Sequence, residues 1–177
     1  MHRGGAAMSE PQQGSGTADQ GPGVLVRPPL LYTGTLIAAV AIDLLVLRGV
    51  GSTFGLTGGP RFLLGLGFLI IGVVLMAAAM TRFGRAGTPV RTSEATQALV
   101  TDGVYRLSRN PIYLGLTANY LGITILADAP VALLLLVPVL LVMRFGVIAR
   151  EERYLSRKYG ETYLAFRRRT GRWLGPI

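Results

Sequence analysis

The feature that most constrains this chain is an uncharged apolar run of nineteen residues, Phe62 to Met80. A helix rises 1.5 Å per residue, so about 20 such residues cross the roughly 30 Å hydrocarbon core of a bilayer. Lipid offers no hydrogen-bond partners, and a helix pairs its backbone groups within one segment. The run therefore predicts a membrane-spanning helix.

Three further apolar runs accompany it. They cover Leu30–Leu47, which Asp43 interrupts, Ile112–Ala127 and Val131–Ile148. Half of the residues are hydrophobic and 15% are charged, and the mean hydropathy is +0.46, whereas about a quarter of the residues in soluble domains are charged. We expect an all-α, polytopic membrane helix bundle with about four spans, at residues 30–47, 62–80, 112–127 and 131–148.

The remaining segments are polar. Residues 1–28 are rich in Gly, Ser, Gln and Pro, which is typical of a flexible tail, and they lack the pattern of a signal peptide. From Arg150 onward the pattern is helical and charged, with a predicted break at Gly160 and an apolar stripe. The stripe comprises Leu155, Tyr159, Tyr163 and Phe166. We expect a tail at 1–28 and one membrane domain at 29–177 that ends in a cytoplasmic helix.

The basic residues are unevenly distributed. The connection 82–110 carries five arginines and the segment 150–172 carries eight basic residues, whereas the turn 128–130 carries none. Lys and Arg are enriched in cytoplasmic loops. A membrane therefore explains the net charge of +9 better than nucleic acid does. We expect the protein in the inner (cytoplasmic) membrane, with both termini and the long connection facing the cytoplasm.

Missing residue types limit the chemistry. The chain has no cysteine, and its one histidine, His2, lies in the predicted tail. Disulfides, thiolate catalysis and Cys-ligated metals are therefore excluded. We expect neither a His-ligated metal site nor a His general base, and no metal.

Two polar blocks rich in Tyr and Arg bracket the last two apolar runs. The first, GVYRLSRNPIYLG at 103–115, leads into an apolar helix at Pro111, and the second, EERYLSRKYGETYLAFRRR, occupies 151–169. Proline at the first helical turn leaves the amides there open, and a helix N-terminus favours anions. The first block could be a helix cap and surface anchor, or a site for a polar ligand. Two such blocks at one face favour a polar site where lipid meets water.

The order and spacing of the blocks resemble the isoprenylcysteine carboxyl methyltransferase and phospholipid methyltransferase superfamily. That family has a Leu-Val-Thr-x-Gly-x-Tyr approach, then Arg-His-Pro or Arg-Asn-Pro, then x-Tyr-x-Gly, which match residues 99–105, 109–111 and 112–115 here. Its Glu-Glu pair matches residues 151–152, followed by spaced tyrosines and a basic end. The resemblance covers roughly residues 87–174 and implies a membrane methyltransferase.

The resemblance implies that segments 87–111 and 150–174 enclose S-adenosylmethionine at the cytoplasmic face, and that a lipid-like acceptor enters from the bilayer. Carried over position by position, the cofactor contacts are Gln97, Ala98, Leu99, Val100, Tyr105, Asn110, Pro111, Ile112, Tyr113 and Glu151.

Two positions depart from the eukaryotic prenylcysteine enzymes. Asn110 replaces their histidine, although Asn is familiar in bacterial members, and Val147 replaces an arginine that would read the substrate carboxylate. Both departures argue against a prenylcysteine substrate, while neither weakens the cofactor assignment much.

The residues themselves leave alternatives open. Tyr105 and Tyr113 could be interfacial anchors, or could face a sulfonium by cation–π attraction. Glu151 and Glu152 could be solvated carboxylates, or one could bind the cofactor's ribose or ammonium group, with Glu151 favoured by the family register.

Other polar residues near the spans are weaker candidates for substrate contact: Arg144, Asn119 and Glu152. Arg144 could instead snorkel to lipid headgroups, and Asn119 could hydrogen-bond between helices. Asp43, an acid within a span, is expected to pair with Arg48 at the outer surface.

The acceptor is not identified by the sequence. A carboxylate is most compatible, because it needs no general base and no base is evident; amines and thiols would need deprotonation. We expect the acceptor to arrive through a gap between the third and fourth spans. Two other classes stay open, an NADPH-dependent membrane reductase of the sterol-reductase type and a non-catalytic membrane scaffold.

Overall fold

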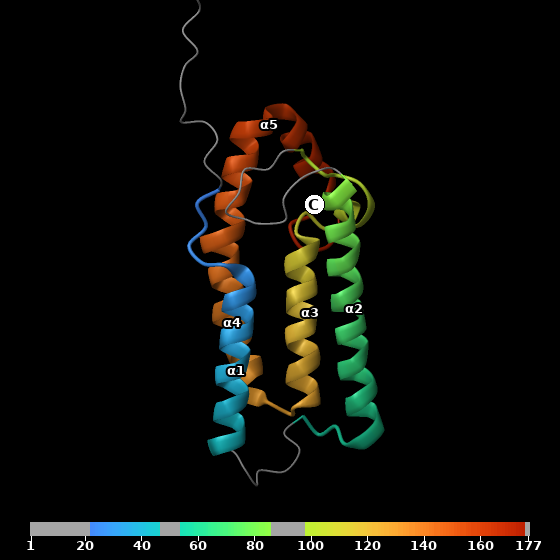
Figure 1. Cartoon of the computed structure of the whole chain (residues 1–177), viewed down its shortest axis with the longest axis vertical. Helices are drawn as coiled ribbons and strands as arrows, with labels where there is room; N and C mark the ends of the chain where they lie inside the picture. Colours follow the sequence, from blue (N-terminus) through green and yellow to red (C-terminus); the bar gives the residue numbers. More distant parts are fainter. Residues whose placement is uncertain (1–21, 47–53, 86–97, 176–177) are drawn as a thin grey trace, which may run out of the picture.

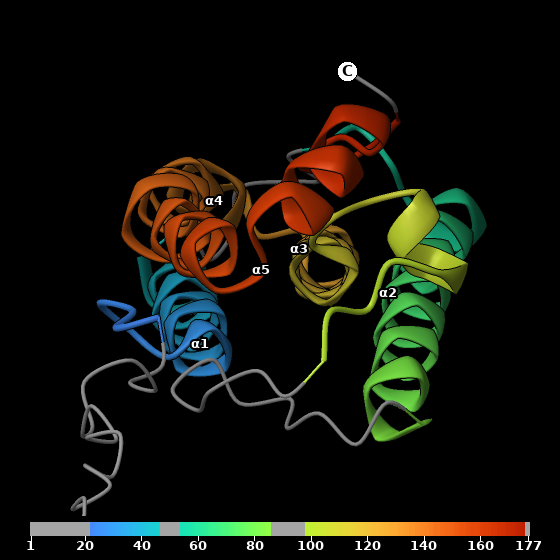
Figure 2. The same ribbon diagram turned by 90° about the horizontal axis from the view of Figure 1, so that it is seen from above.

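The computed structural model describes residues 22–46, 54–85 and 98–175 of the chain. Their elements, in order, are α1 (Pro28–Val46), α2 (Gly58–Arg85), the 3-10 helix η1 (Gly103–Arg106), α3 (Pro111–Leu126), α4 (Pro130–Val142), the π-helical turn η2 (Met143–Ile148) and α5 (Ala149–Arg169). The described residues form no strand, so the expected all-α fold is confirmed. The long helices run alternately up and down, and α3 lies between α2 on one side and α1 with α4 on the other (Figures 1 and 2).

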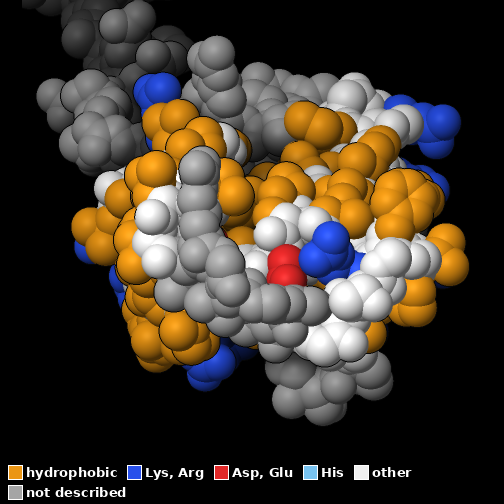
Figure 3. All heavy atoms as spheres, turned by 90° about the horizontal axis from the view of Figure 1, so that it is seen from below, with side chains coloured by type: hydrophobic (Ala, Val, Ile, Leu, Met, Phe, Trp, Pro, Cys, Tyr) orange, Lys and Arg blue, Asp and Glu red, His pale blue; other side chains and the backbone are white. Residues whose placement is uncertain are grey.

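The apolar helices have the dimensions of membrane spans. Among the described residues, three helices are long and apolar enough to cross a bilayer: α1, α2 and the continuous helix that begins at Pro130, whose apolar part is α4 with η2. α3 is a shorter apolar helix of 16 residues. Large aliphatic side chains such as Leu45, Leu63 and Leu134 are exposed on the outer faces, as expected of surfaces that contact lipid. Hydrophobic side chains also predominate on the described surface at the end opposite α5 (Figure 3).

Facing glycines bring α2 and α3 into close contact. Gly72 on α2 lies against Gly115 on α3, and Gly65 lies against Gly122. A Cβ atom added to Gly72 would lie 2.7 Å from the Gly115 carbonyl oxygen, and one added to Gly115 would lie 2.8 Å from the Gly72 carbonyl oxygen. Small residues allow this backbone approach between membrane helices. The seam fixes the end of α2 against the beginning of α3, where the polar blocks meet.

We expect Gly72→Ala to lower the free energy of unfolding by about 1–3 kcal/mol, because its Cβ would overlap both Asn119 and the α3 backbone. Gly67→Ala is the matched control, since a Cβ there has nothing within 4 Å and alanine is the better helix former by about 1 kcal/mol. Unfolding in detergent would compare the two variants. Equal stabilities would show that the seam tolerates a methyl group.

Asp43 caps another helix. Its carboxylate accepts hydrogen bonds from the backbone amides of Val131, at 3.1 Å, and Ala132, at 3.4 Å. These amides belong to the first turn of α4, whose N-cap residue Ala129 has no side-chain cap to offer. Arg48, the expected partner of Asp43, lies outside the described residues. The described contacts of Asp43 thus form a helix cap, which a negative charge at a helix N-terminus strengthens, and the expected pair with Arg48 stays a prediction.

Asp43→Ala is expected to destabilise the protein by about 0.5–2 kcal/mol, the usual cost of losing a helix cap. Asp43→Asn, which keeps an oxygen acceptor, should cost less. Thermal unfolding of both variants in the same detergent measures the difference. If the alanine variant were as stable as the wild type, the cap would contribute nothing.

The segment before α1 and the helix after α4 meet at the upper end of the bundle. The Leu25 amide donates to the Gly146 carbonyl oxygen at 3.3 Å, and Arg150 Nη1 donates to the Gly23 carbonyl oxygen at 2.9 Å. Residues 22–27 of the predicted tail therefore pack on η2 and α5, while residues 1–21 lie outside the described part. The predicted break at Gly160 is confirmed: its φ of 50° and ψ of −129° kink α5, which then turns back above α3 (Figure 2).

Candidate active site

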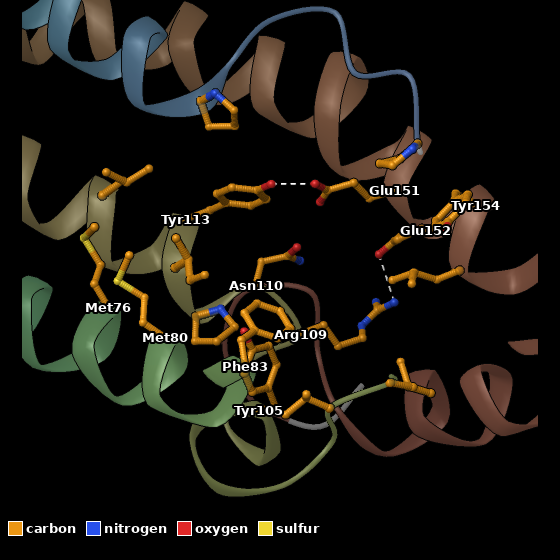
Figure 4. Close-up of a pocket in the computed structure, with 18 of the residues that line it drawn as sticks. Met76, Met80, Phe83, Tyr105, Arg109, Asn110, Tyr113, Glu151, Glu152 and Tyr154 are labelled. Atoms are coloured by element: carbon orange, nitrogen blue, oxygen red, sulfur yellow. Dashed lines mark hydrogen bonds and ion pairs between the residues drawn. The ribbon is translucent and has the colours of Figure 1, made fainter. Parts of the chain in front are cut away.

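A cavity of about 790 Å³ lies at the α5 end of the bundle. The beginnings of α1, α3 and α5 and the end of α2 surround it, together with η1 (Figure 4). This volume is within the range of about 300–1,000 Å³ that small-molecule sites occupy. Its walls are largely apolar, and a few polar side chains converge in it, which is the usual composition of a ligand site.

The cavity brings together residues from both polar blocks. Nine of the ten positions predicted to contact a cofactor line it: Ala98, Leu99, Val100, Tyr105, Asn110, Pro111, Ile112, Tyr113 and Glu151. The tenth, Gln97, lies outside the described residues.

The three weaker substrate candidates lie in different places. Glu152 lines the cavity, whereas Arg144 and Asn119 do not. Arg144 is exposed on η2, with its guanidinium carbon 5.5 Å from the centre of the Phe145 ring. Asn119 faces α2, where its amide nitrogen lies 3.5 Å from Met76 Sδ. Asn119 therefore packs between helices, which is the alternative that its sequence context left open.

Glu151 stands at the centre of the polar part of the cavity. It follows η2 in the first turn of α5, and the Tyr113 hydroxyl donates a hydrogen bond of 2.6 Å to Glu151 Oε1 (Figure 4). Burial raises the pKa of the Glu151 carboxyl from 4.5 to about 7; the Tyr113 hydrogen bond opposes this rise and the nearby Glu152 adds to it. Within the described part of the chain, no arginine or lysine forms an ion pair with Glu151. The site thus holds a partly buried carboxylate that has no ion pair among the described residues.

Glu152 is in the opposite situation. Arg172 binds it through two hydrogen bonds, Nε to Oε1 at 3.0 Å and Nη2 to Oε2 at 2.6 Å. Arg109 Nη1 lies 2.9 Å from Oε1 of the same carboxylate, and the Arg109 side chain is only 4% exposed. Two guanidinium groups therefore neutralise Glu152, whereas Glu151 has a hydrogen bond from Tyr113 and no ion pair among the described residues.

The first turn of α3 presents open backbone amides beside these carboxylates. Pro111 is the first residue of the helix, as predicted, and Asn110 is at the N-cap position. The Asn110 side chain does not cap the helix, however; its Nδ2 donates to the Arg172 carbonyl oxygen at 2.9 Å. The amides of the first turn therefore lack a side-chain cap and can receive an anionic group.

Aromatic rings form the wall next to η1. The rings of Tyr105 and Phe83 lie 5.4 Å apart between centroids, and both line the cavity. Burial, with a smaller contribution from Glu151, raises the pKa of the Tyr105 hydroxyl well above its ordinary value of 10.0. Tyr105 therefore stays neutral at physiological pH and offers a ring face and a hydrogen-bond donor.

The prediction from sequence missed an apolar wall that α2 provides. Met76, Met80 and Phe83 line the cavity and are four and three residues apart, so they share one face of the helix. That spacing is visible in the sequence, but inside a uniformly apolar run it does not stand out. Arg109, Tyr163 and Phe166 also line the cavity; the last two belong to the apolar stripe noted above.

The exposed apolar helices define the class as an integral membrane protein, and the cavity at one end, with its apolar walls and buried charge, is its candidate small-molecule site. The model of the phospholipid methyltransferase family matches residues 60–162, more than half of the chain, and the chain belongs to this family.

Several relatives are named methyltransferases. The chain is 34% identical over 106 residues to protein-S-isoprenylcysteine O-methyltransferase of Schizosaccharomyces pombe, covering 59% of this chain and 45% of that protein. It is 32% identical over 110 residues to protein-S-isoprenylcysteine O-methyltransferase B of Arabidopsis thaliana, covering 59% and 54%. It is 38% identical over 90 residues to human phosphatidylethanolamine N-methyltransferase, covering 50% and 45%. The chain spans about half the length of these relatives, and no solved structure matches it significantly.

Proposed function

We propose that this chain is an S-adenosylmethionine-dependent methyltransferase that acts on a lipid-like or small apolar acceptor. One observation carries the proposal: nine predicted cofactor positions, from residues 98–113 and from Glu151, line a single cavity that contains the partly buried Glu151 carboxylate. The family match favours this function over a sterol-type NADPH reductase or a scaffold.

The residues fit the proposed cofactor. Its carboxylate suits the uncapped first turn of α3, and its ammonium or ribose hydroxyls suit Glu151, which has no ion pair among the described residues. Its sulfonium suits the faces of Tyr105 and Phe83, which attract a cation without attacking it. When bound, S-adenosylmethionine supplies an activated methyl group. The chain's part is to align the two reactants and to exclude water, which its apolar walls favour.

Several acceptor groups are compatible with the site. A carboxylate acceptor needs no general base, and the sequence favoured it because no base was evident there. The structure adds one candidate: where no cofactor cation pairs with its carboxylate, Glu151, with a pKa near 7, can take a proton from an amine or thiol at neutral pH. Val147, at the position of the carboxylate-reading arginine, is buried in the core and does not line the cavity. Methylation assays should therefore compare lipids that carry carboxylate, amine and thiol groups.

The apolar walls favour entry of the acceptor from the bilayer between α1 and α2, a different side from the gap between the third and fourth spans that the sequence predicted. Leu30 on α1 and Met80 on α2 both line the cavity and are exposed on the outer surface, whereas α4 contributes no residue to the described lining. We propose that the acceptor enters between α1 and α2 rather than between the third and fourth spans. The basic residues of α5 lie at the same end, which supports a cytoplasmic site.

Calorimetric titration of the detergent-purified chain tests the function. S-adenosylmethionine and S-adenosylhomocysteine should each bind saturably at one site, while NADPH should not bind. Binding of NADPH alone would indicate a membrane reductase instead. Absence of binding by all three ligands to folded protein would favour the scaffold.

A further inference from the structure

The last described residues close over the loop that leads into α3. The Arg109 amide donates to the Gly171 carbonyl oxygen at 3.0 Å, and the Gly175 amide donates to the Leu107 carbonyl oxygen at 3.1 Å. Asn110 adds the side-chain bond to the Arg172 carbonyl oxygen. We call residues 170–175 the C-terminal clasp. Its hydrogen bonds with this loop all fall on residues 107–110, immediately before the first turn of α3.

The Glu152 carboxylate joins the clasp to this loop. Both of its oxygens receive hydrogen bonds from Arg172 in the clasp, and one also pairs with Arg109 in the loop. The Glu152 side chain is 11% exposed. It therefore has little remaining capacity to bind a ligand, although it lines the cavity.

We infer that Glu152 is a positioning residue that, through Arg172, holds the C-terminal clasp against residues 107–110 and so sets the first turn of α3. The part of this inference that concerns ligand binding rests on the proposed function. Without Glu152, the buried guanidinium of Arg109 would lose the one ion pair that it forms within the described residues, and a buried charge left unpaired forces its surroundings to rearrange. The loop that carries Asn110 would move with it.

The first experiment needs no ligand. Hydrogen exchange of the detergent-solubilised chain is compared for the wild type, Glu152→Gln and Arg172→Gln. Both variants should exchange about tenfold faster or more at residues 107–113 and 170–175. Arg172→Gln leaves Glu152 paired with Arg109, so it is expected to fold even if Glu152→Gln does not. Glu161→Gln is the matched control. Glu161 belongs to the same helix, its side chain is 84% exposed, and its one described ion pair, with Arg168, is long at 3.9 Å.

Trp173 gives an independent signal. It is the only tryptophan of the chain, it lies within the clasp, and it packs against the core. Quenching of its fluorescence by acrylamide should increase in both variants and stay unchanged in the control. The double variant should be no worse than the stronger single one, because the two side chains act through one contact.

Binding of S-adenosylmethionine shows whether Glu152 positions the loop or contacts the ligand directly. We expect about tenfold weaker binding or more in both Glu152→Gln and Arg172→Gln. Weaker binding in Glu152→Gln alone, with wild-type exchange and quenching, would overturn the inference and make Glu152 a ligand contact. Unchanged exchange in both variants would also overturn it. If the wild type binds no S-adenosylmethionine, the proposed function fails, and the exchange at residues 107–113 still decides the role of Glu152.

Discussion

Glu151→Gln is expected to weaken S-adenosylmethionine binding by about 10- to 100-fold while leaving the protein folded. The amide keeps the shape of the side chain but removes a carboxylate that, among the described residues that line the cavity, is the one without an ion pair. A hydrogen bond to a charged group contributes about 1.5–3 kcal/mol, which corresponds to this range. Calorimetric titration of the purified variant measures the loss.

The control for this prediction is Glu161→Gln, which removes a solvent-exposed acid from the same helix. It should bind as the wild type does. Unfolding curves of both variants show whether the fold is intact. Wild-type affinity in folded Glu151→Gln would remove Glu151 from the binding site.

Binding of the same cofactor is expected to strengthen about tenfold for each pH unit between about pH 5 and pH 7, and to level off above pH 7. Burial raises the pKa of Glu151 to about 7 in the folded protein, so the acid is neutral below that pH. A cation bound at the carboxylate favours the ionised form and releases this proton, and each linked proton changes the affinity tenfold per pH unit. Titrations at half-unit intervals measure the slope.

Glu151→Gln is the control here too, because it cannot titrate at this position and should have no such slope. The same group also affects stability, with the opposite sign. Its pKa is higher in the folded state than its ordinary value of 4.5, so the folded protein holds this proton more tightly. The contribution of Glu151 to stability is therefore greatest below pH 4.5 and is lost as the pH rises to about 7. A wild-type affinity independent of pH across this range would contradict the role of Glu151.

The sequence alone predicted the helical framework because its signals are local. The apolar run from Phe62 to Met80 is too long and too uniform to be anything but a membrane helix, and it lies within α2. Pro111 likewise marks the start of α3. Composition and motif order were also sufficient to recognise the family, which the family model confirmed.

The tertiary structure alone decided how these residues are used. Glu151 and Glu152 are neighbours in sequence, but consecutive helix residues point about 100° apart, so only the packing of α3 and the C-terminal clasp decides which acid is neutralised. Asp43 caps α4, a helix that begins 87 residues later along the chain, and nothing in the sequence near Asp43 identifies that partner. The wall of Met76, Met80 and Phe83 is one face of an apolar helix among several, and the seam with α3 selects it. Sequence determined the elements here because helix formation and membrane insertion depend on nearby residues; the contacts of the site depend on how the elements pack.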